Sequence, residues 1–406
     1  MNQNTSLSRR QLVIAACLAL AACGGGGSDA GGSPESAPAG DPAPSGGGGQ
    51  TTLSLTQVSA RFQHTAALTS DGMVLTWGAN DAGQLGDGST QDRSSAVAPN
   101  GLSAARSVAA GLGHTLVART DGSVWSFGAN DRYQLGDGTV ATRTTPVLVP
   151  GLAGIQAVRT GASFSLALGT DGSVYAWGDN RHGQLGLGTK SDASTPMAIP
   201  AFGTVADIRA GENYVLALRQ DGTVWTWGQS LLAELGDDPG ATDSTSPVQV
   251  AGLSGIVAIE AGDLHALALR SDGVVLVWGN NEYGQLGLGA TGSKASPVEL
   301  PGVGPIAAIY AGSIDSFAIG IDGSAYGWGD NYYGKLGDGT DAERASPLPI
   351  PVLNGARGIG LGFTHSVVVR ADGSAWAVGN NEHGQLGDGT TASRLQFGPV
   401  QLPAGQ

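Results

Sequence analysis

The chain has 406 residues, of which 41% are hydrophobic and 13% are charged, and its formal net charge at pH 7 is −14. A chain this acidic repels phosphate backbones, which argues against nucleic acid as a partner. Its only cysteines are Cys17 and Cys23, so a disulfide framework, a thiolate metal site and a cysteine nucleophile are excluded beyond residue 23.

The N-terminus has the layout of a secretory signal. Arg9 and Arg10 precede an apolar run, residues 12–22, that is too short to span a bilayer as a helix. The run ends in Leu-Ala-Ala-Cys-Gly, which resembles the bacterial lipobox, and this resemblance implies that Cys23 is lipidated and becomes the new N-terminus. We therefore expect residues 1–22 to be removed as a signal peptide and the protein to be a lipoprotein of the cell envelope, held at the membrane by its acyl chains.

The export route has two readings. Arg9-Arg10 also resembles a twin-arginine signal, so general secretion and twin-arginine export both stay open, as does an ordinary signal peptide with an accidental cysteine. Gly24 stands after the lipidated residue in place of an aspartate, which favours the outer membrane. Residues 23–50 are then rich in Gly, Ser, Pro and Ala, and we expect them to form a disordered tether.

Beyond the tether, residues 51–406 repeat one phrase seven times. Each copy contains an Asp-Gly pair, a short strand that ends on Trp-Gly or a variant of it, and in most copies a Gln-Leu-Gly. The Asp-Gly pairs begin at Asp71, Asp121, Asp171, Asp221, Asp272, Asp322 and Asp372, at intervals of 50, 50, 50, 51, 50 and 50 residues. A period of this length predicts stacked repeats that make a common core between neighbours.

The second repeat illustrates the expected unit. Residues 107–110, 114–119, 124–127 and 145–149 read as four strands, with Asp121-Gly122 as a type I′ hairpin turn in which both central residues have positive φ. Four strands per 50 residues make one propeller blade, so the predicted fold is an all-β, seven-bladed β-propeller. The last fourth-strand segment, residues 399–402, has no later repeat to join, and we expect it to pair beside the N-terminal repeat and close the ring.

Two side-chain series recur in the repeats. Bulky residues stand at i and i+2 after each turn, as Trp125 and Phe127 do, and all eight tryptophans belong to this series, which indicates packing between blades. Histidine recurs seven residues before the Asp of the turn, at His64, His114, His265 and His365. This histidine is interpreted as a buried structural residue bonded to nearby backbone, and a ring of ligands facing the channel is the alternative.

The repeat pattern resembles that of the regulator of chromosome condensation (RCC1) family. The second repeat carries it as Ala-Gly-Leu-Gly-His-Thr at residues 110–115, Asp-Gly-Ser-Val-Trp at 121–125, Asn130, and Gln-Leu-Gly-Asp-Gly-Thr at 134–139. The resemblance covers residues 53–406 and implies a seven-bladed propeller of a kind widely used as a binding platform. Guanine-nucleotide exchange, the activity of the founding member, depends on a loop that projects from one blade, and repeats of equal length leave no room for one.

No sequence motif for an enzyme, a metal site or a cofactor stands out. The Gly-x-x-Gly-like run at residues 83–88 lacks the lysine and the following helix of a phosphate loop. The acidic loop at residues 330–341 does not have the spacing of a calcium loop. We therefore expect no cofactor and no metal, although propeller active sites assemble single residues from several blades, and a sequence alone does not reveal such an assembly.

The fourth repeat departs most from the pattern. Where other repeats read Asn-x-x-Gly-Gln-Leu-Gly-Asp-Gly, it reads Gln-Ser-Leu-Leu-Ala-Glu-Leu-Gly-Asp-Asp from residue 229. Apolar anchors beside acidic residues are typical of a protein-binding patch, whereas simple drift of one blade is the alternative. The candidate partner-binding residues are Leu231, Leu232, Glu234, Asp237 and Asp238.

Taken together, these features predict a monomeric, membrane-anchored propeller that acts as a non-catalytic platform for an unidentified protein. One alternative is an enzyme acting on the cell envelope or on a polymeric carbohydrate. Carboxylates or histidines that converge at one mouth of the channel would favour the enzyme, and a channel lined by small apolar residues would not. Nucleotide exchange by family analogy is a second, disfavoured alternative.

Overall fold

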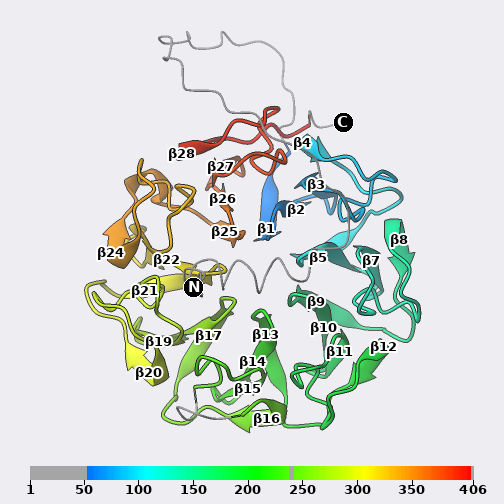
Figure 1. The fold of residues 1–406 in the computed structure, drawn as a ribbon, viewed down its shortest axis with the longest axis horizontal. Helices are drawn as coiled ribbons and strands as arrows, with labels where there is room; N and C mark the ends of the chain where they lie inside the picture. Colours follow the sequence, from blue (N-terminus) through cyan, green and yellow to red (C-terminus); the bar gives the residue numbers. More distant parts are fainter. Residues whose placement is uncertain (1–52, 237–241, 404–406) are drawn as a thin grey trace, which may run out of the picture. The chain divides into compact units, whose positions relative to one another are not determined.

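The computed structural model describes residues 53–236 and 242–403, which form seven four-stranded antiparallel sheets arranged as the blades of a ring (Figure 1). This confirms the predicted seven-bladed propeller. Within every sheet the order of the strands follows their order along the chain, so each blade is one continuous segment. Lipidation at Cys23 and the two aspartates Asp237 and Asp238 lie outside the described residues.

The blades in chain order have the following strands. Blade 1 comprises β1 (Leu55–Arg61), β2 (His64–Thr69), β3 (Val74–Gly78) and β4 (Arg93–Val97); blade 2, β5 (Ala105–Ala110), β6 (His114–Arg119), β7 (Val124–Gly128) and β8 (Arg143–Leu148); blade 3, β9 (Ile155–Thr160), β10 (Phe164–Gly169), β11 (Val174–Gly178) and β12 (Ala193–Ala198); blade 4, β13 (Val205–Ala210), β14 (Tyr214–Arg219), β15 (Val224–Gly228) and β16 (Ser244–Gln249). Blade 5 comprises β17 (Ile256–Ala261), β18 (His265–Arg270), β19 (Val275–Gly279) and β20 (Lys294–Glu299); blade 6, β21 (Ile306–Ala311), β22 (Asp315–Gly320), β23 (Ala325–Gly329) and β24 (Arg344–Pro349); blade 7, β25 (Gly358–Leu361), β26 (His365–Val369), β27 (Ala375–Gly379) and β28 (Arg394–Pro399). A short 3₁₀ helix, η1 (Pro351–Leu353), joins blades 6 and 7.

The first strand of each blade lines a central channel, and the fourth lies at the rim (Figure 1). His114 at the start of β6 pairs with Gly128 at the end of β7, so the turn between strands one and two and the loop between strands three and four lie at the same end of the blade. We call this end the loop face. The opposite end carries the Asp-Gly turns and the connections between blades, and we call it the hairpin face.

The Asp-Gly turns differ from the prediction in their type. Gly122 has a φ of +82°, but Asp121 is not among the residues with positive φ, which a type I′ turn requires. Instead Gly122 N donates to the Arg119 carbonyl at 2.9 Å and Arg119 N donates to Ser123 O at 2.9 Å, the pattern of a three-residue loop with a bulge at the glycine. The Asp121 carboxylate accepts bonds from the amide and hydroxyl of Ser123, which favours this turn.

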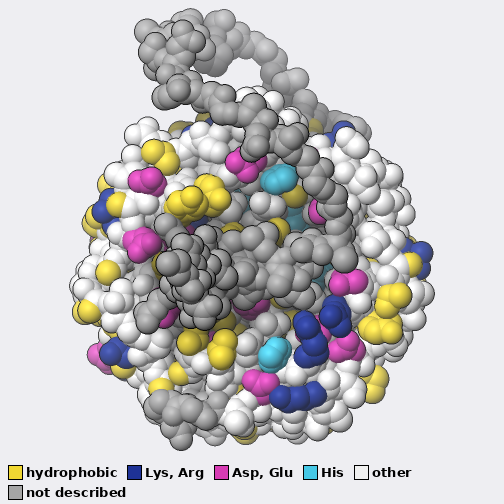
Figure 2. Space-filling model, in the orientation of Figure 1, with side chains coloured by type: hydrophobic (Ala, Val, Ile, Leu, Met, Phe, Trp, Pro, Cys, Tyr) yellow, Lys and Arg dark blue, Asp and Glu magenta, His cyan; other side chains and the backbone are white. Residues whose placement is uncertain are grey.

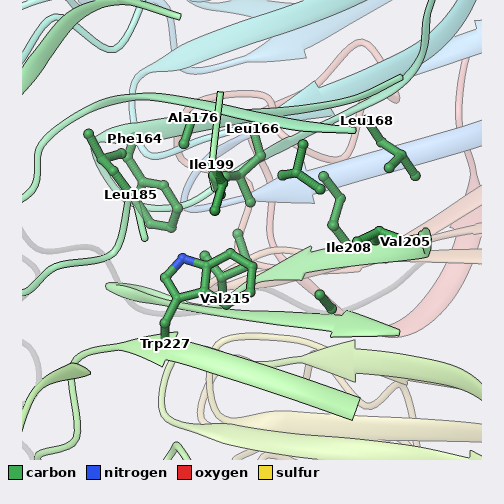
Figure 3. Close-up of a cluster of buried hydrophobic side chains, with 13 residues drawn as sticks. Phe164, Leu166, Leu168, Ala176, Leu185, Ile199, Val205, Ile208, Val215 and Trp227 are labelled. Atoms are coloured by element: carbon green, nitrogen blue, oxygen red, sulfur yellow. The ribbon is translucent and has the colours of Figure 1, made fainter. Parts of the chain in front are cut away.

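Aromatic packing between blades is confirmed. The indole of Trp227, on β15, lies fully buried between blades 3 and 4 among side chains such as Leu166 and Val215 (Figure 3). Its Nε1 donates to the carbonyl of Gln184 in the preceding blade at 3.0 Å. Gly186 has a φ of +68°, and a Cβ placed there would lie 2.8 Å from that indole nitrogen. The Gly of each Gln-Leu-Gly therefore lets the next blade approach closely.

Blade 7 solves the same packing problem with a different strand. Val378 occupies the position that holds Trp227 in blade 4 and is much smaller than an indole. Phe397, from the outer strand β28, fills this space, and a Cβ at Gly337 would lie 2.2 Å from its ring. The sequence series therefore breaks at Val378 while the inter-blade core stays filled.

Ring closure also differs from the prediction. The last strand pairs with β27 inside its own sheet and does not pair with the N-terminal repeat. Blades 1 and 7 close the ring side by side. Trp77 Nε1 donates to the Gln385 carbonyl at 3.0 Å, and Leu55 N donates to the Gly373 carbonyl at 3.0 Å. Because each blade is a complete sheet, closure uses the same kind of contacts as most of the other blade junctions.

Candidate functional site

The recurring histidines are structural. His64 is fully buried, and its Nε2 lies 3.0 Å from the hydroxyl of Thr115 in the next blade. Thr115 gives its only proton to the Gln84 carbonyl, so it accepts from the imidazole. Corresponding bonds join His114 to blade 3, His265 to blade 6 and, across the closure, His365 to Thr65. Their partner is thus a side-chain hydroxyl and not the backbone that we expected.

Burial keeps these imidazoles neutral. It lowers the pKa of His64 to about 4 and that of His114, His265 and His365 to about 3. Within the part of the chain that the structure describes, their Nδ1 atoms have no hydrogen-bond partner. None of the four lines the channel, so they do not form a ligand ring there.

Two blades replace this histidine and the Gln of Gln-Leu-Gly together. In blade 6 the pair is Asp315 and Lys335, which are both fully buried, with Lys335 Nζ at 2.7 Å from Asp315 Oδ1 and 3.4 Å from Asp330 Oδ2. In blade 4 the pair is Tyr214 and Glu234. The Tyr214 hydroxyl donates to the His265 carbonyl, and burial raises the pKa of Glu234 to about 7.

The Gln-Leu-Gly loops hold themselves in place. In blade 2, Nδ2 of the buried Asn130 donates to the Asp137 carboxylate and to the carbonyls of Thr139 and Ala141, and its Oδ1 accepts from Leu135 N. Such bonds satisfy the backbone of a long loop. The recurring loop residues are therefore scaffold, and the informative positions are those that vary.

The fourth-blade loop lacks this anchor. Ser230 replaces the asparagine, and its buried hydroxyl has no hydrogen-bond partner among the described residues. Leu231 is 68% exposed and Leu232 is half-buried. Glu234 is fully buried, accepting a bond from Leu232 N at 2.7 Å, so it contributes no charge to the surface. Of the candidate residues that the structure describes, only the two leucines reach solvent.

The same two loop positions form an arc on the loop face. They carry Leu231 and Leu232 in blade 4, Glu282 and Tyr283 in blade 5, and Tyr332 and Tyr333 in blade 6. Tyr332 is 48% exposed, and its ring packs edge-on against Tyr333 at a centroid distance of 4.6 Å. Figure 2 shows hydrophobic side chains gathered on this face over β21–β24. We call Leu231, Leu232, Tyr332 and Tyr333 the apolar arc.

Inside the arc, the mouth of the channel is acidic on one side. The turns between strands one and two place Glu212 of blade 4 and Asp263 of blade 5 next to each other, where Glu212 N donates to the Asp263 carbonyl at 3.1 Å. Arg61 reaches across from blade 1 and binds Asp263 Oδ1 at 2.7 Å and the carbonyls of Thr160 and Ala210. All six other blades have glycine where Arg61 stands.

Glu212 is the least compensated of these charges. Glu212 is only 9% exposed. Within residues 53–236 and 242–403 its carboxylate has no hydrogen bond or ion pair. Burial, and then the neighbouring Asp263, raise the pKa of Glu212 to about 7, against the opposing effect of Arg61. The mouth therefore has two carboxylates and one guanidinium.

The channel wall itself is charged but balanced. Asp207 accepts from Arg209 at 2.6 Å and from Arg159 at 3.2 Å, and Arg209 also binds Glu260 at 3.0 Å. Across the channel, the inner strands of blades 7, 1 and 2 present small residues such as Gly360. The volume of the channel cavity is about 340 Å³. The two carboxylates at one mouth meet in part the criterion that we set out for an enzyme, and the charged wall departs from the small apolar lining that would count against one.

Sequence reasoning missed the residues at this mouth. Arg61, Glu212 and Asp263 stand in short turns whose composition changes from blade to blade, so they belong to no repeated pattern. The available signal was Arg61, a long cation at a position that is glycine in the other six repeats. Among the described residues, no group of three or more His, Cys, Asp or Glu side chains is arranged to hold a metal ion, and no helix is long and apolar enough to cross a membrane.

The chain resembles known proteins over most of its length. It matches the family model of the RCC1-like domain over residues 93–405 and that of the regulator of chromosome condensation (RCC1) repeat over residues 55–84. No curated protein matches it. Among solved structures, Prp20p from Saccharomyces cerevisiae, described with its binding properties to Gsp1p and histones, has 22% identity and a TM-score of 0.71, over 86% of this chain and 88% of that one.

Two further structures are similar. Yeast RCC1 (Prp20) bound to Kap60 has 22% identity and a TM-score of 0.72, over 86% of this chain and 85% of that one. Human WBSCR16 has 22% identity and a TM-score of 0.70, over 78% of this chain and 87% of that one. At this identity the likeness extends to the fold alone.

Proposed function

This chain belongs to the family of RCC1-like domains, and we propose that it serves as a non-catalytic platform on which a partner protein docks. The observation that carries the proposal is the exposure of Leu231, 68%, in the blade whose loop departs most from the repeat. Exposed apolar side chains at a break in an otherwise regular scaffold are typical of a docking surface. Yeast relatives that are described with protein partners are consistent with this role.

The platform is proposed to act from a membrane. The lipobox-like sequence around Cys23 and the tether of residues 23–50 support an exported, monomeric lipoprotein of the cell envelope. A tether of this length has an end-to-end distance of roughly 30 Å, which holds a domain clear of lipid headgroups. Metabolic labelling with a palmitate analogue tests this part, because a Cys23→Ser variant is expected to lose the label.

Capture from cross-linked envelopes tests the docking surface. The native protein is run beside a Leu231→Ser, Leu232→Ser variant and beside a matched control, Ile321→Ser, which removes a side chain that is 70% exposed on the hairpin face. We expect one protein to be recovered with the native form and the control and to be lost with the leucine variant. Equal recovery with all three forms contradicts the proposed surface.

A carbohydrate-acting enzyme is the second candidate, and the Glu212–Asp263 pair is the observation that favours it. A carboxylic acid that stays protonated near neutral pH beside an ionised one can serve as the general acid of a glycosidase. Release of reducing sugar from envelope polysaccharide, abolished by Glu212→Gln, would support this function. We rank it below the platform because Asp263 is already bound by Arg61.

Nucleotide exchange is not proposed. It would need a projecting loop, and the loops of residues 53–236 and 242–403 follow the repeat in length.

A further inference from the structure

We infer that the partner presents a basic segment to the loop face, with a lysine or arginine side chain at the channel mouth beside Glu212 and Asp263 and apolar side chains on the apolar arc. This inference rests on the proposed function and specifies the chemistry of the partner. Its basis is the charge of the mouth, the position of the apolar arc around it and the pairing of Arg181 and Lys190 on the same face.

The mouth lacks one positive charge. Asp263 is bound by Arg61 at 2.7 Å, and Arg61 spends two further bonds on the carbonyls of Thr160 and Ala210. Glu212 receives neither an ion pair nor a hydrogen bond from the described residues. A buried carboxylate in this situation is costly, and a cation brought by a partner would stabilise it.

The arc supplies the apolar part of the interface. Leu231 and Tyr332 are large and exposed, and they belong to blades on either side of the blade that carries Asp263. Tyrosine combines apolar area with a polar hydroxyl and is enriched in protein interfaces. Opposite the acids, the rings of Phe62 and Phe363 lie 5.9 Å apart at the mouth and offer an apolar surface to the stem of a lysine or arginine.

The cations of the same face do not favour an acidic partner. Arg181 is bound to Asp179 at 2.7 Å and Lys190 to Asp243 at 2.8 Å, both in or next to blade 3. These two charges are neutralised within the protein, whereas Arg132, in the corresponding loop of blade 2, has no ion pair among the described residues. An acidic segment would meet paired cations on blade 3 and uncompensated acid at the mouth, so charge complementarity selects a basic segment.

Binding of two synthetic peptides to the propeller tests the inference. One fluorescein-labelled peptide alternates leucine, glycine and lysine, and its partner replaces every lysine by glutamate. We expect the lysine peptide to bind at low salt, to weaken at about 1 M NaCl, where charges are screened within about 3 Å, and to bind more tightly at pH 8 than at pH 6, where Glu212 gains its proton. The glutamate peptide is expected not to bind.

Two variants locate the site. Glu212→Gln keeps the shape of the side chain and is expected to lower the affinity about tenfold. It is also expected to reduce the change in affinity between pH 6 and 8, to which Glu234 also contributes. Asp171→Asn, which removes an exposed carboxylate on the hairpin face, is the matched control and should bind as the native protein does. Circular dichroism confirms that each variant is folded, and Asp263→Asn replaces Glu212→Gln if the latter is not.

Equal affinity of the native protein and Glu212→Gln, or tighter binding of the glutamate peptide, overturns the inference. The result of the peptide experiment can be distinguished from the result of the envelope capture, which tests the proposed platform. If the envelope capture depends on Leu231 and Leu232 but the peptide does not respond to Glu212, the platform stands and the basic partner does not. If the capture also fails, both fall.

Discussion

Lys335 is a buried lysine whose charge is compatible with its position only because Asp315 lies beside it. In most blades a neutral histidine and glutamine occupy two equivalent buried positions, whereas blade 6 has Asp315 and Lys335 there, 2.7 Å apart. Burial raises the pKa of Asp315 to about 6, and Lys335 opposes this shift, so the pair is ionised at neutral pH. Either residue alone would destabilise the folded protein in this environment, because a buried charge needs its counterion.

Removing one charge from blade 6 is expected to be more harmful than removing both. Lys335→Met should lower the free energy of unfolding by about 3–5 kcal/mol, since it leaves Asp315 buried without its cation. Asp315→His with Lys335→Gln restores the pair that the other blades use and should cost much less. Urea denaturation measures both, and additive effects of the two single changes would contradict the coupling.

Glu234 is expected to make stability depend on pH. Its pKa is raised to about 7 in the folded protein, against about 4.5 unfolded, so the folded state binds the proton more tightly. Its contribution is therefore present in full below pH 4.5 and is lost as pH rises toward 7. Glu234→Gln should match the native protein near pH 4 and exceed its stability by about 3 kcal/mol at pH 8. Denaturation at the two pH values tests this. A difference in stability between the two proteins that stays constant with pH would show that burial does not raise the pKa of Glu234.

At the scale of the element, the blade is a frame of constant loops with a few variable positions. Asn130 binds three loop oxygens and one amide, so its side chain organises the whole connection between β7 and β8. Ser230 holds the same place in blade 4 and binds none of them. The leucines that follow Ser230 are thus presented on a less constrained loop.

The two positions give a matched comparison. Asn130→Ala should destabilise the protein by about 2–3 kcal/mol, because it leaves buried backbone groups without partners. Ser230→Ala, at the equivalent position, should change stability by less than about 0.5 kcal/mol. Thermal unfolding of both variants checks the expectation, and similar losses would mean that the loop is held by something other than the asparagine.

The sequence allowed the number of blades, their strands and the Trp227-type contacts to be predicted, because these follow from a 50-residue period and an i, i+2 pattern. The type of the Asp-Gly turn was predicted wrongly, because Asp121-Gly122 also suits a three-residue loop that Ser123 stabilises. Glu212 and Asp263 could not be found, since two acids 51 residues apart meet only when neighbouring blades are packed. A repeat reveals its scaffold readily, whereas a site built from residues outside the repeat needs the structure.

At the scale of the whole molecule, the closure between blades 7 and 1 is an ordinary junction. Both blades are complete sheets, and the residues flanking the propeller, Leu53 and Leu402, pack against the same apolar cluster. The position of the chain ends is therefore not dictated by the need to close a ring.

A circular permutant should consequently fold. Joining the present ends and opening the chain at Gly101, in the exposed connection between β4 and β5, leaves every sheet intact. We expect its circular dichroism to be unchanged and its midpoint of thermal unfolding to fall by only about 2–4 °C, a loss of about 1 kcal/mol. An insoluble or unfolded permutant would show that the present junction contributes more than its contacts indicate.

Arg61 gives this ring a mechanical property. It is the last residue of β1, the first strand of the propeller, and it forms hydrogen bonds or an ion pair with blades 3, 4 and 5 on the far side of the channel. A pull on the chain upstream of Leu55 would enter the molecule through β1. Arg61 would transmit part of that force directly across the channel to blades 3, 4 and 5, in addition to the force transmitted from blade to blade around the ring. The strand closest to any anchor is thus also the one braced against three other blades.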